Sequence, residues 1–63
     1  SEMCIRDRAI QRIEIFDVTG RILKTIESRD LLKVVVDATD LPRGLLVVQV
    51  ATKKKIHVFK IWN

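Results

Sequence analysis

Apolar residues alternate with polar ones from Ile10 onward, and this two-residue period decides which kind of fold is open to the chain. Ile13 and Ile15 flank Glu14, and the apolar positions do not follow the 3.6-residue spacing of a helix. The three valines at 34–36 also favour a strand, because side chains branched at Cβ pack well on a pleated surface. The sequence therefore predicts an all-β, antiparallel fold, interrupted at the polar stretch 27–30, with strands over 10–16, 22–27, 33–37, 45–50 and 56–62.

Turn-forming residues separate the predicted strands. Asp17 and Gly20 occupy the first and fourth positions of a segment that suits a type I turn with a glycine bulge. Pro42 restricts φ and Gly44 can adopt a positive φ, so this second segment predicts a tight turn. Leu41 is the apolar exception in that turn and is expected to cover the edge of the core. In the last strand apolar residues fall on both faces, so we expect a bulge there or cover on both sides.

The sequence offers few residues for catalysis or metal binding. A chain of 63 residues buries only about 60% of its unfolded surface, which leaves little room for a core and a deep cleft together. His57 is the only histidine and Cys4 the only cysteine, so we interpret His57 as a surface or cross-strand residue. Asp37 and Asp40 are close enough in sequence for acid–base chemistry, but carboxylates beside a turn more often accept hydrogen bonds from backbone N–H groups. We expect no enzyme and no cofactor.

The charge pattern gives a weak indication of an acidic partner. Twelve basic and eight acidic residues leave a net charge of +4. The arginines are scattered, and the one basic run, Lys53–Lys55, is expected to form a solvated turn. A small basic β domain that binds nucleic acid is the alternative, and it would be retained on DNA in a strongly salt-dependent way. We expect neither a nucleic-acid nor a small-molecule partner, and the uncharged runs are too short to span a membrane.

The first eight residues differ from the rest of the chain. They show no clear hydrophobic period, and Met3 lies inside the segment. The run Ser-Glu-Met-Cys-Ile-Arg-Asp resembles the translation of a transposase mosaic-end adapter used to prepare sequencing libraries. This resemblance implies that residues 1–8 are not native, that residues 9–63 are a domain truncated at its N-terminal side, and that Cys4 says nothing about the redox environment. We then expect an uncovered sheet edge at Ile13 and Ile15 or at the three valines.

The order of the remaining elements resembles the C-terminal sorting domain of cargo of the type IX secretion system. That family has a strand ending in an aromatic residue and Asp before a turn Gly, then an Asp before a Leu-x-x-Gly turn and an apolar strand, then a closing strand with a Lys near its end. The matching residues are Phe16, Asp17 and Gly20 for the first element, Asp37, Leu41, Gly44, Val48 and Val50 for the second, and Lys60 and Ile61 for the third. The match spans residues 10–63.

The resemblance implies a secretion signal rather than a catalyst. The family fold is an immunoglobulin-like antiparallel β-sandwich at the end of an exported protein. Its partners are the outer-membrane translocon and a sortase-like signal peptidase, and its route leads through the periplasm to the cell surface or the medium. Lys60 is then expected to contact the machinery. The family's Ile-Tyr pair is replaced here by Leu45 and Leu46, and its opening Asn-Pro strand is absent. A generic β-sandwich accessory module, such as a fibronectin-type or adhesion domain, is the alternative.

Overall fold

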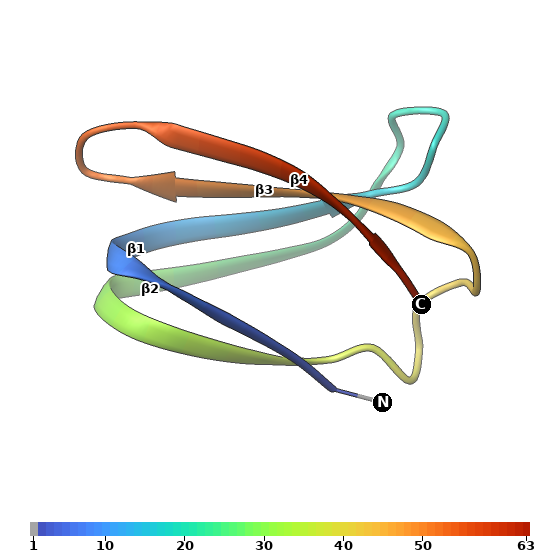
Figure 1. Cartoon of the computed structure of the whole chain (residues 1–63), viewed down its shortest axis with the longest axis horizontal. Coiled ribbons are helices and arrows are strands. Elements are labelled where there is room, and N and C mark those ends of the chain that lie inside the picture. Colours follow the sequence, from blue (N-terminus) through green and yellow to red (C-terminus); the bar gives the residue numbers. More distant parts are fainter. Residues whose placement is uncertain (1) are drawn as a thin grey trace.

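The computed structural model describes residues 2–63, with Asp30 described by its backbone alone. It contains strands β1 (Glu2–Phe16), β2 (Ile22–Asp37), β3 (Leu45–Thr52) and β4 (Ile56–Trp62). These strands form one antiparallel sheet in the order β2-β1-β3-β4 (Figure 1). The prediction of an all-β, antiparallel fold is confirmed.

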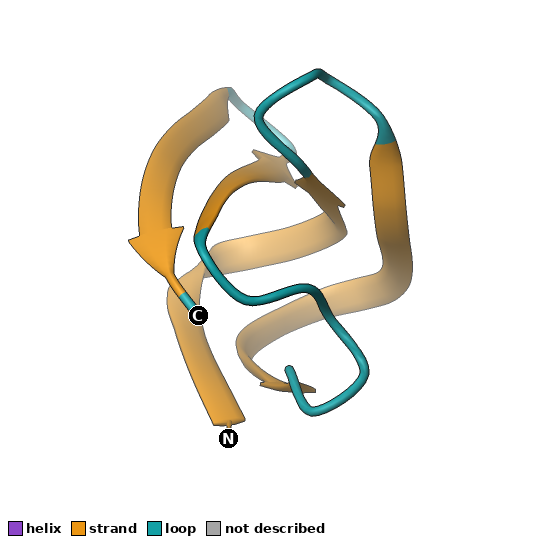
Figure 2. Ribbon diagram, turned by 90° about the vertical axis from the view of Figure 1, so that its right-hand side faces the viewer, coloured by secondary structure: helices purple, strands orange, loops and turns teal. Residues whose placement is uncertain are grey.

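The long hairpin of β1 and β2 bends halfway along its length. The pairing register shifts between Arg6 and Ile10 and again between Ile10 and Arg12, and Ala9 has a φ of 52°. A positive φ is uncommon for a residue with a Cβ atom, and together with the register shifts it marks a bulge that turns the strand. The Ser28 hydroxyl donates a hydrogen bond of 2.5 Å to the carbonyl of Ile10 at this bend. The sheet therefore folds over itself into a sandwich-like arrangement of two layers (Figure 2).

The hydrophobic core lies between these layers. Ile13 and Ile15 of β1 pair with Val50 and Val48 of β3, and all four side chains are buried. The two-residue period of each strand places its apolar members on this inner side. The whole core consists of Ile5, Ile10, Ile13, Ile15, Val34, Val36, Ala38, Leu41, Leu46, Val48 and Val50.

Two of the predicted strands, 22–27 and 33–37, are the two halves of β2. The polar stretch between them was expected to be a break, but the backbone continues through it as a strand. The reason is pairing across the bend, where Arg12 lies opposite Glu27 and Ile10 lies opposite Leu31. The Arg12 guanidinium also contacts the Glu27 carboxylate at 3.2 Å.

Residues 2–8 form the first half of β1. Residues 2–6 pair with 33–37, and Met3 and Ile5 are turned toward the core at alternate positions. This short alternation was not recognised in the sequence. The expectation of an uncovered edge is wrong for Val34 and Val36, which are buried against this segment, and for Ile13 and Ile15, which are buried elsewhere in the core. Val35 alone among the expected residues is exposed, at 50%. That residues 1–8 are non-native stays a prediction.

The last hairpin differs from the expected one in how its apolar residues are used. β3 and β4 pair without a register shift, and the outer side chains Ile56 and Val58 are exposed, so residues 45–62 show neither the bulge nor the second cover. The turn between these strands is as predicted. Its three lysines are exposed, and the Thr52 hydroxyl accepts hydrogen bonds from the backbone of Lys54 and Lys55.

Candidate recognition surface

Most of the residues that carry the family resemblance lie near one end of the molecule, whereas Val48 and Val50 lie within β3. Residues 17–21 connect β1 with β2, and residues 38–44 connect β2 with β3; both connections lie at the same end, near the end of β4 (Figure 1). Asp37, Leu41 and Gly44 lie in or beside the second connection, and Asp17 and Gly20 form the first. Ile61 lies in β4 opposite Leu46. The sequence motif thus corresponds to two turns and one closing strand.

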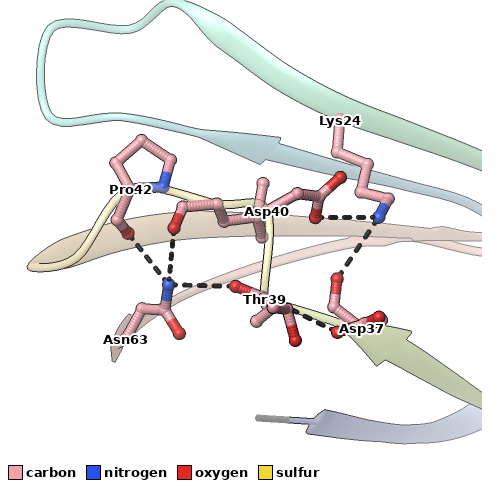
Figure 3. A network of polar contacts seen from close by, with 8 residues as sticks. Lys24, Asp37, Thr39, Asp40, Pro42 and Asn63 are labelled. Carbon is pink, nitrogen blue, oxygen red and sulfur yellow. Dashed lines mark hydrogen bonds and ion pairs between the residues drawn. The ribbon is translucent and has the colours of Figure 1, made fainter.

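Asn63 holds the 38–44 connection in place. Its side-chain Nδ2 donates to the carbonyl oxygens of Ala38 (3.3 Å), Leu41 (3.1 Å) and Pro42 (2.9 Å), as Figure 3 shows. Its backbone exchanges two hydrogen bonds with Gly44, at 2.9 and 3.1 Å. The backbone carbonyls of this irregular segment have no partner strand, so they need hydrogen-bond donors from elsewhere, and the Asn63 side chain supplies one. The end of β4 therefore determines the shape of this connection.

Leu41 and Gly44 have the roles that the sequence indicated. The Leu41 side chain is 8% exposed and belongs to the core, while its N–H donates to the carbonyl of Ala38 at 3.1 Å. Gly44 has a φ of 118°, in the region that residues with a Cβ atom avoid. The segment thus turns on a glycine and is anchored by one buried leucine.

Asp37 closes the end of β2. Its Oδ1 accepts a hydrogen bond of 2.9 Å from the N–H of Thr39. A hydrogen bond from the Thr39 side chain, and then this backbone bond, lower the pKa of Asp37 below its ordinary value of 3.8. The prediction that Asp37 accepts a hydrogen bond from a backbone N–H group beside the turn is confirmed. Lys24 reaches the same place from the other half of β2, with its Nζ 3.3 Å from the Asp37 carbonyl and 3.6 Å from the Asp40 carboxylate (Figure 3).

Asp17 closes the first connection in the same way. Its Oδ1 accepts hydrogen bonds from the Thr19 hydroxyl (2.6 Å), the Thr19 N–H (2.9 Å) and the Arg21 N–H (3.0 Å). These bonds, that from the Thr19 side chain first, lower the pKa of Asp17 below 3.8. Gly20 has a φ of 91° and donates to the Asp17 carbonyl, so the predicted turn with a positive φ at this glycine is confirmed.

The outer side of β4 presents an apolar row with one positive charge. Val58 is 62% exposed and Trp62 is 80% exposed, and Lys60 stands between them on the same face. Ile61 points the other way and packs against the core. Since β4 is the last strand in the sheet order, its outer backbone edge has no strand partner within residues 2–63. We call the exposed Val58, Lys60 and Trp62 side chains, with this edge, the β4 surface.

The rest of the described chain gives no clear catalytic arrangement. No group of three or more His, Cys, Asp or Glu side chains within it is placed to bind a metal ion. His57 lies 3.3 Å from the Asp7 carboxylate beside a hollow of about 460 Å³ that the lysine turn also lines. Residues 2–63 contain no helix long and apolar enough to cross a membrane.

Sequence reasoning missed two residues of this end of the molecule. Asn63 carries no motif signal, because an amide at the end of a strand is compatible with many environments. Lys24 follows the strand alternation and looks like an ordinary surface lysine, yet it lies on the inner side of β2 opposite Ile15. Only the bend of β2 brings it to Asp37 and Asp40.

Comparisons of this chain with protein-family models, with curated proteins and with solved structures found no match.

Proposed function

We propose that the chain is a C-terminal sorting domain that directs an exported protein to a type IX translocon. The single observation that carries this proposal is the β4 surface, where Lys60 is exposed between Val58 and Trp62 on an unpaired strand edge. An open strand edge can bind an extended segment through backbone hydrogen bonds, and the flanking side chains add specificity. This mode of recognition needs no pocket.

The motif residues support the proposal through the fold. Asp37, Leu41 and Gly44 shape the connection that receives Asn63, and Asn63 in turn positions the end of β4. On this reading most of the family motif maintains the geometry of the closing strand. Lys60 is exposed on β4 and takes part in neither turn, so its side chain is available for contact with a partner. The partners would be the translocon and a sortase-like signal peptidase, reached in the periplasm, with the cell surface or the medium as the destination.

The experiment fuses the whole chain behind a secreted reporter in a bacterium with a type IX system. Lys60→Glu and Trp62→Ser are expected to reduce reporter at the surface and in the medium at least several-fold and to leave it in the periplasm. Both side chains are exposed, so neither change should disturb the core. Lys54→Glu, in the exposed lysine turn, is the matched control and should export normally.

Point variants are preferable to a deletion of the last strand residues. Such a deletion would remove Ile61 from the core and Asn63 from the connection, so lost export would also follow from unfolding. A translocon-deficient strain gives the baseline. Normal export of the Lys60 and Trp62 variants, or export that does not depend on the translocon, would contradict the proposal and favour the accessory β-sandwich module.

A further inference from the structure

The first half of β1, residues 2–8, which we call the arm, makes a small set of contacts. Its backbone pairs with residues 33–37 of β2, from Glu2 opposite Asp37 to Arg6 opposite Lys33. Ile5 is 5% exposed, whereas Met3 is only partly buried against the core. The arm is thus held by one strand edge, by very few apolar side chains and by the contact of 3.3 Å between the Asp7 carboxylate and His57.

The arm is joined to the rest of the sheet through a strained hinge. Ala9 has a φ of 52°. The pairing register of β1 with β2 shifts between Arg6 and Ile10, which flank Ala9, and again between Ile10 and Arg12. A residue with a Cβ atom is disfavoured in this region because the Cβ approaches the carbonyl oxygen. If Ala9 relaxed to an extended φ, β1 would continue straight and carry the arm away from its own β2.

Removing the arm would leave a specific vacancy on β2. Val34 and Val36 would be uncovered, and the backbone of residues 33–37 would lose its partner strand. The strand that fits this vacancy is the arm itself, and a second copy of the chain carries the same arm and the same vacancy. Reciprocal exchange is therefore self-complementary and closes after two copies.

We propose that the chain forms a strand-swapped dimer in which the arm of each copy pairs with residues 33–37 of the other. Every arm contact of the monomer is rebuilt, and the strain at both Ala9 hinges is released. The occupant of the vacancy is a second copy of this chain. The exchange needs only the printed sequence and is independent of the proposed export function.

Cys4 provides a direct probe of the exchange. It is exposed and lies opposite Val35, which is 50% exposed on the same outer side. Directly opposed strand residues have Cα atoms about 4.5–5.5 Å apart, which is suitable for a disulfide. In the Val35→Cys variant the introduced thiol should therefore form a disulfide with Cys4 under mild oxidation. This cross-strand disulfide lies within one chain in the monomer and between chains in the swapped dimer.

The assay mixes ¹⁵N-labelled and unlabelled Val35→Cys chains, incubates them over a concentration series, oxidises them and digests them. Swapping predicts peptide pairs joined by the cross-strand disulfide with one labelled and one unlabelled half, in a proportion that rises with concentration. The chain with Cys4 alone shows how much cross-linking between two copies of Cys4 arises from collisions. Mixed pairs joined by the cross-strand disulfide at the collision level throughout the series would overturn the proposal.

Substitutions at the hinge test its cause. Ala9→Gly removes the steric penalty of the positive φ and so stabilises the monomer relative to the swapped form. Each hinge should change the equilibrium constant about fivefold, so two hinges should raise the dimer dissociation constant roughly 30-fold. Ala9→Val disfavours the positive φ further and should lower that constant. Sedimentation of both variants, after their strand content has been checked by circular dichroism, gives the constants. A dimer that Ala9→Gly leaves unweakened would also overturn the proposal, even if Ala9→Val fails to fold.

Discussion

Removal of the Asn63 carboxamide should loosen the 38–44 connection. Asn63→Ala deletes the donor that serves the carbonyls of Ala38, Leu41 and Pro42, while its backbone bonds to Gly44 can remain. The amide group has two hydrogens, so it supplies about two full hydrogen bonds shared among three acceptors. At about 1 kcal/mol net for each bond, the loss in the free energy of unfolding should be about 2 kcal/mol.

That loss is large for a chain of this size. At roughly 0.05–0.15 kcal/mol per residue the folded state is stable by about 3–9 kcal/mol. Each kcal/mol shifts the melting temperature of such a small domain by about 4–8 °C, so Asn63→Ala should melt roughly 10 °C lower. Urea unfolding, monitored by far-ultraviolet circular dichroism, measures the free energy of unfolding. An unchanged slope of this free energy against urea concentration would show that parent and variant expose the same surface on unfolding.

Asn63→Asp separates the loss of hydrogen bonds from the loss of volume. It keeps the shape but places an ionised acceptor against carbonyl oxygens, so at pH 7 it should be less stable than Asn63→Ala. Lys54→Ala, in the exposed turn, is the control and should be neutral. Asn63→Ala within about 0.5 kcal/mol of the parent, or Asn63→Asp as stable as the parent, would refute the role given to this side chain.

Two further predictions concern the same end of the molecule. Gly44→Ala should lower the free energy of unfolding by about 1–2 kcal/mol. The cause would be backbone strain alone, since the φ of Gly44 is 118° and a Cβ there would meet no atom within 4 Å. D-alanine at this position, in a synthetic chain, should restore the stability, and an L-alanine chain as stable as the parent would contradict the strain. The pKa of Asp37 should lie below 3.8 by carboxyl NMR titration and rise toward that value in Thr39→Ala. Because the pKa of Asp37 is lower in the folded state, its ionised carboxylate stabilises the fold at pH values above the ordinary pKa. This contribution is lost as the pH falls through the folded pKa. Thr39→Ala removes part of it, so this variant should begin to unfold in acid at a higher pH than the parent. An Asp37 pKa at its ordinary value in the parent would contradict the stabilising role given to the Thr39 hydrogen bonds.

The fold class was predictable from local pattern. The alternation around Ile13 and Ile15 and the three valines at 34–36 describe strands with one buried side, whatever their partners. The turn residues were predictable for a related reason. A positive φ at Gly20 and Gly44 is a property of a single residue and its neighbours, and the sequence shows it directly.

The polar caps could be inferred only in part. The sequence indicated that Asp37 would accept backbone hydrogen bonds, because the donor N–H of Thr39 is two residues away. It contained no sign that Lys24 would approach Asp40, since these residues are sixteen positions apart and meet only when β2 bends. Likewise, Asn63 finds Ala38, twenty-five positions away, because β4 returns along β3.

The sequence by itself determined the extended conformation of residues 10–16, 22–27, 33–37, 45–50 and 56–62 and the positions of the turns, because these depend on residues close together in the chain. Tertiary structure alone decided that 22–27 and 33–37 form one strand, that residues 2–6 cover Val34 and Val36, and that Lys60 faces outward from an edge strand. Strand continuity, cover and edge position depend on which distant backbone groups pair, and pairing between distant segments leaves no period in the sequence of either partner.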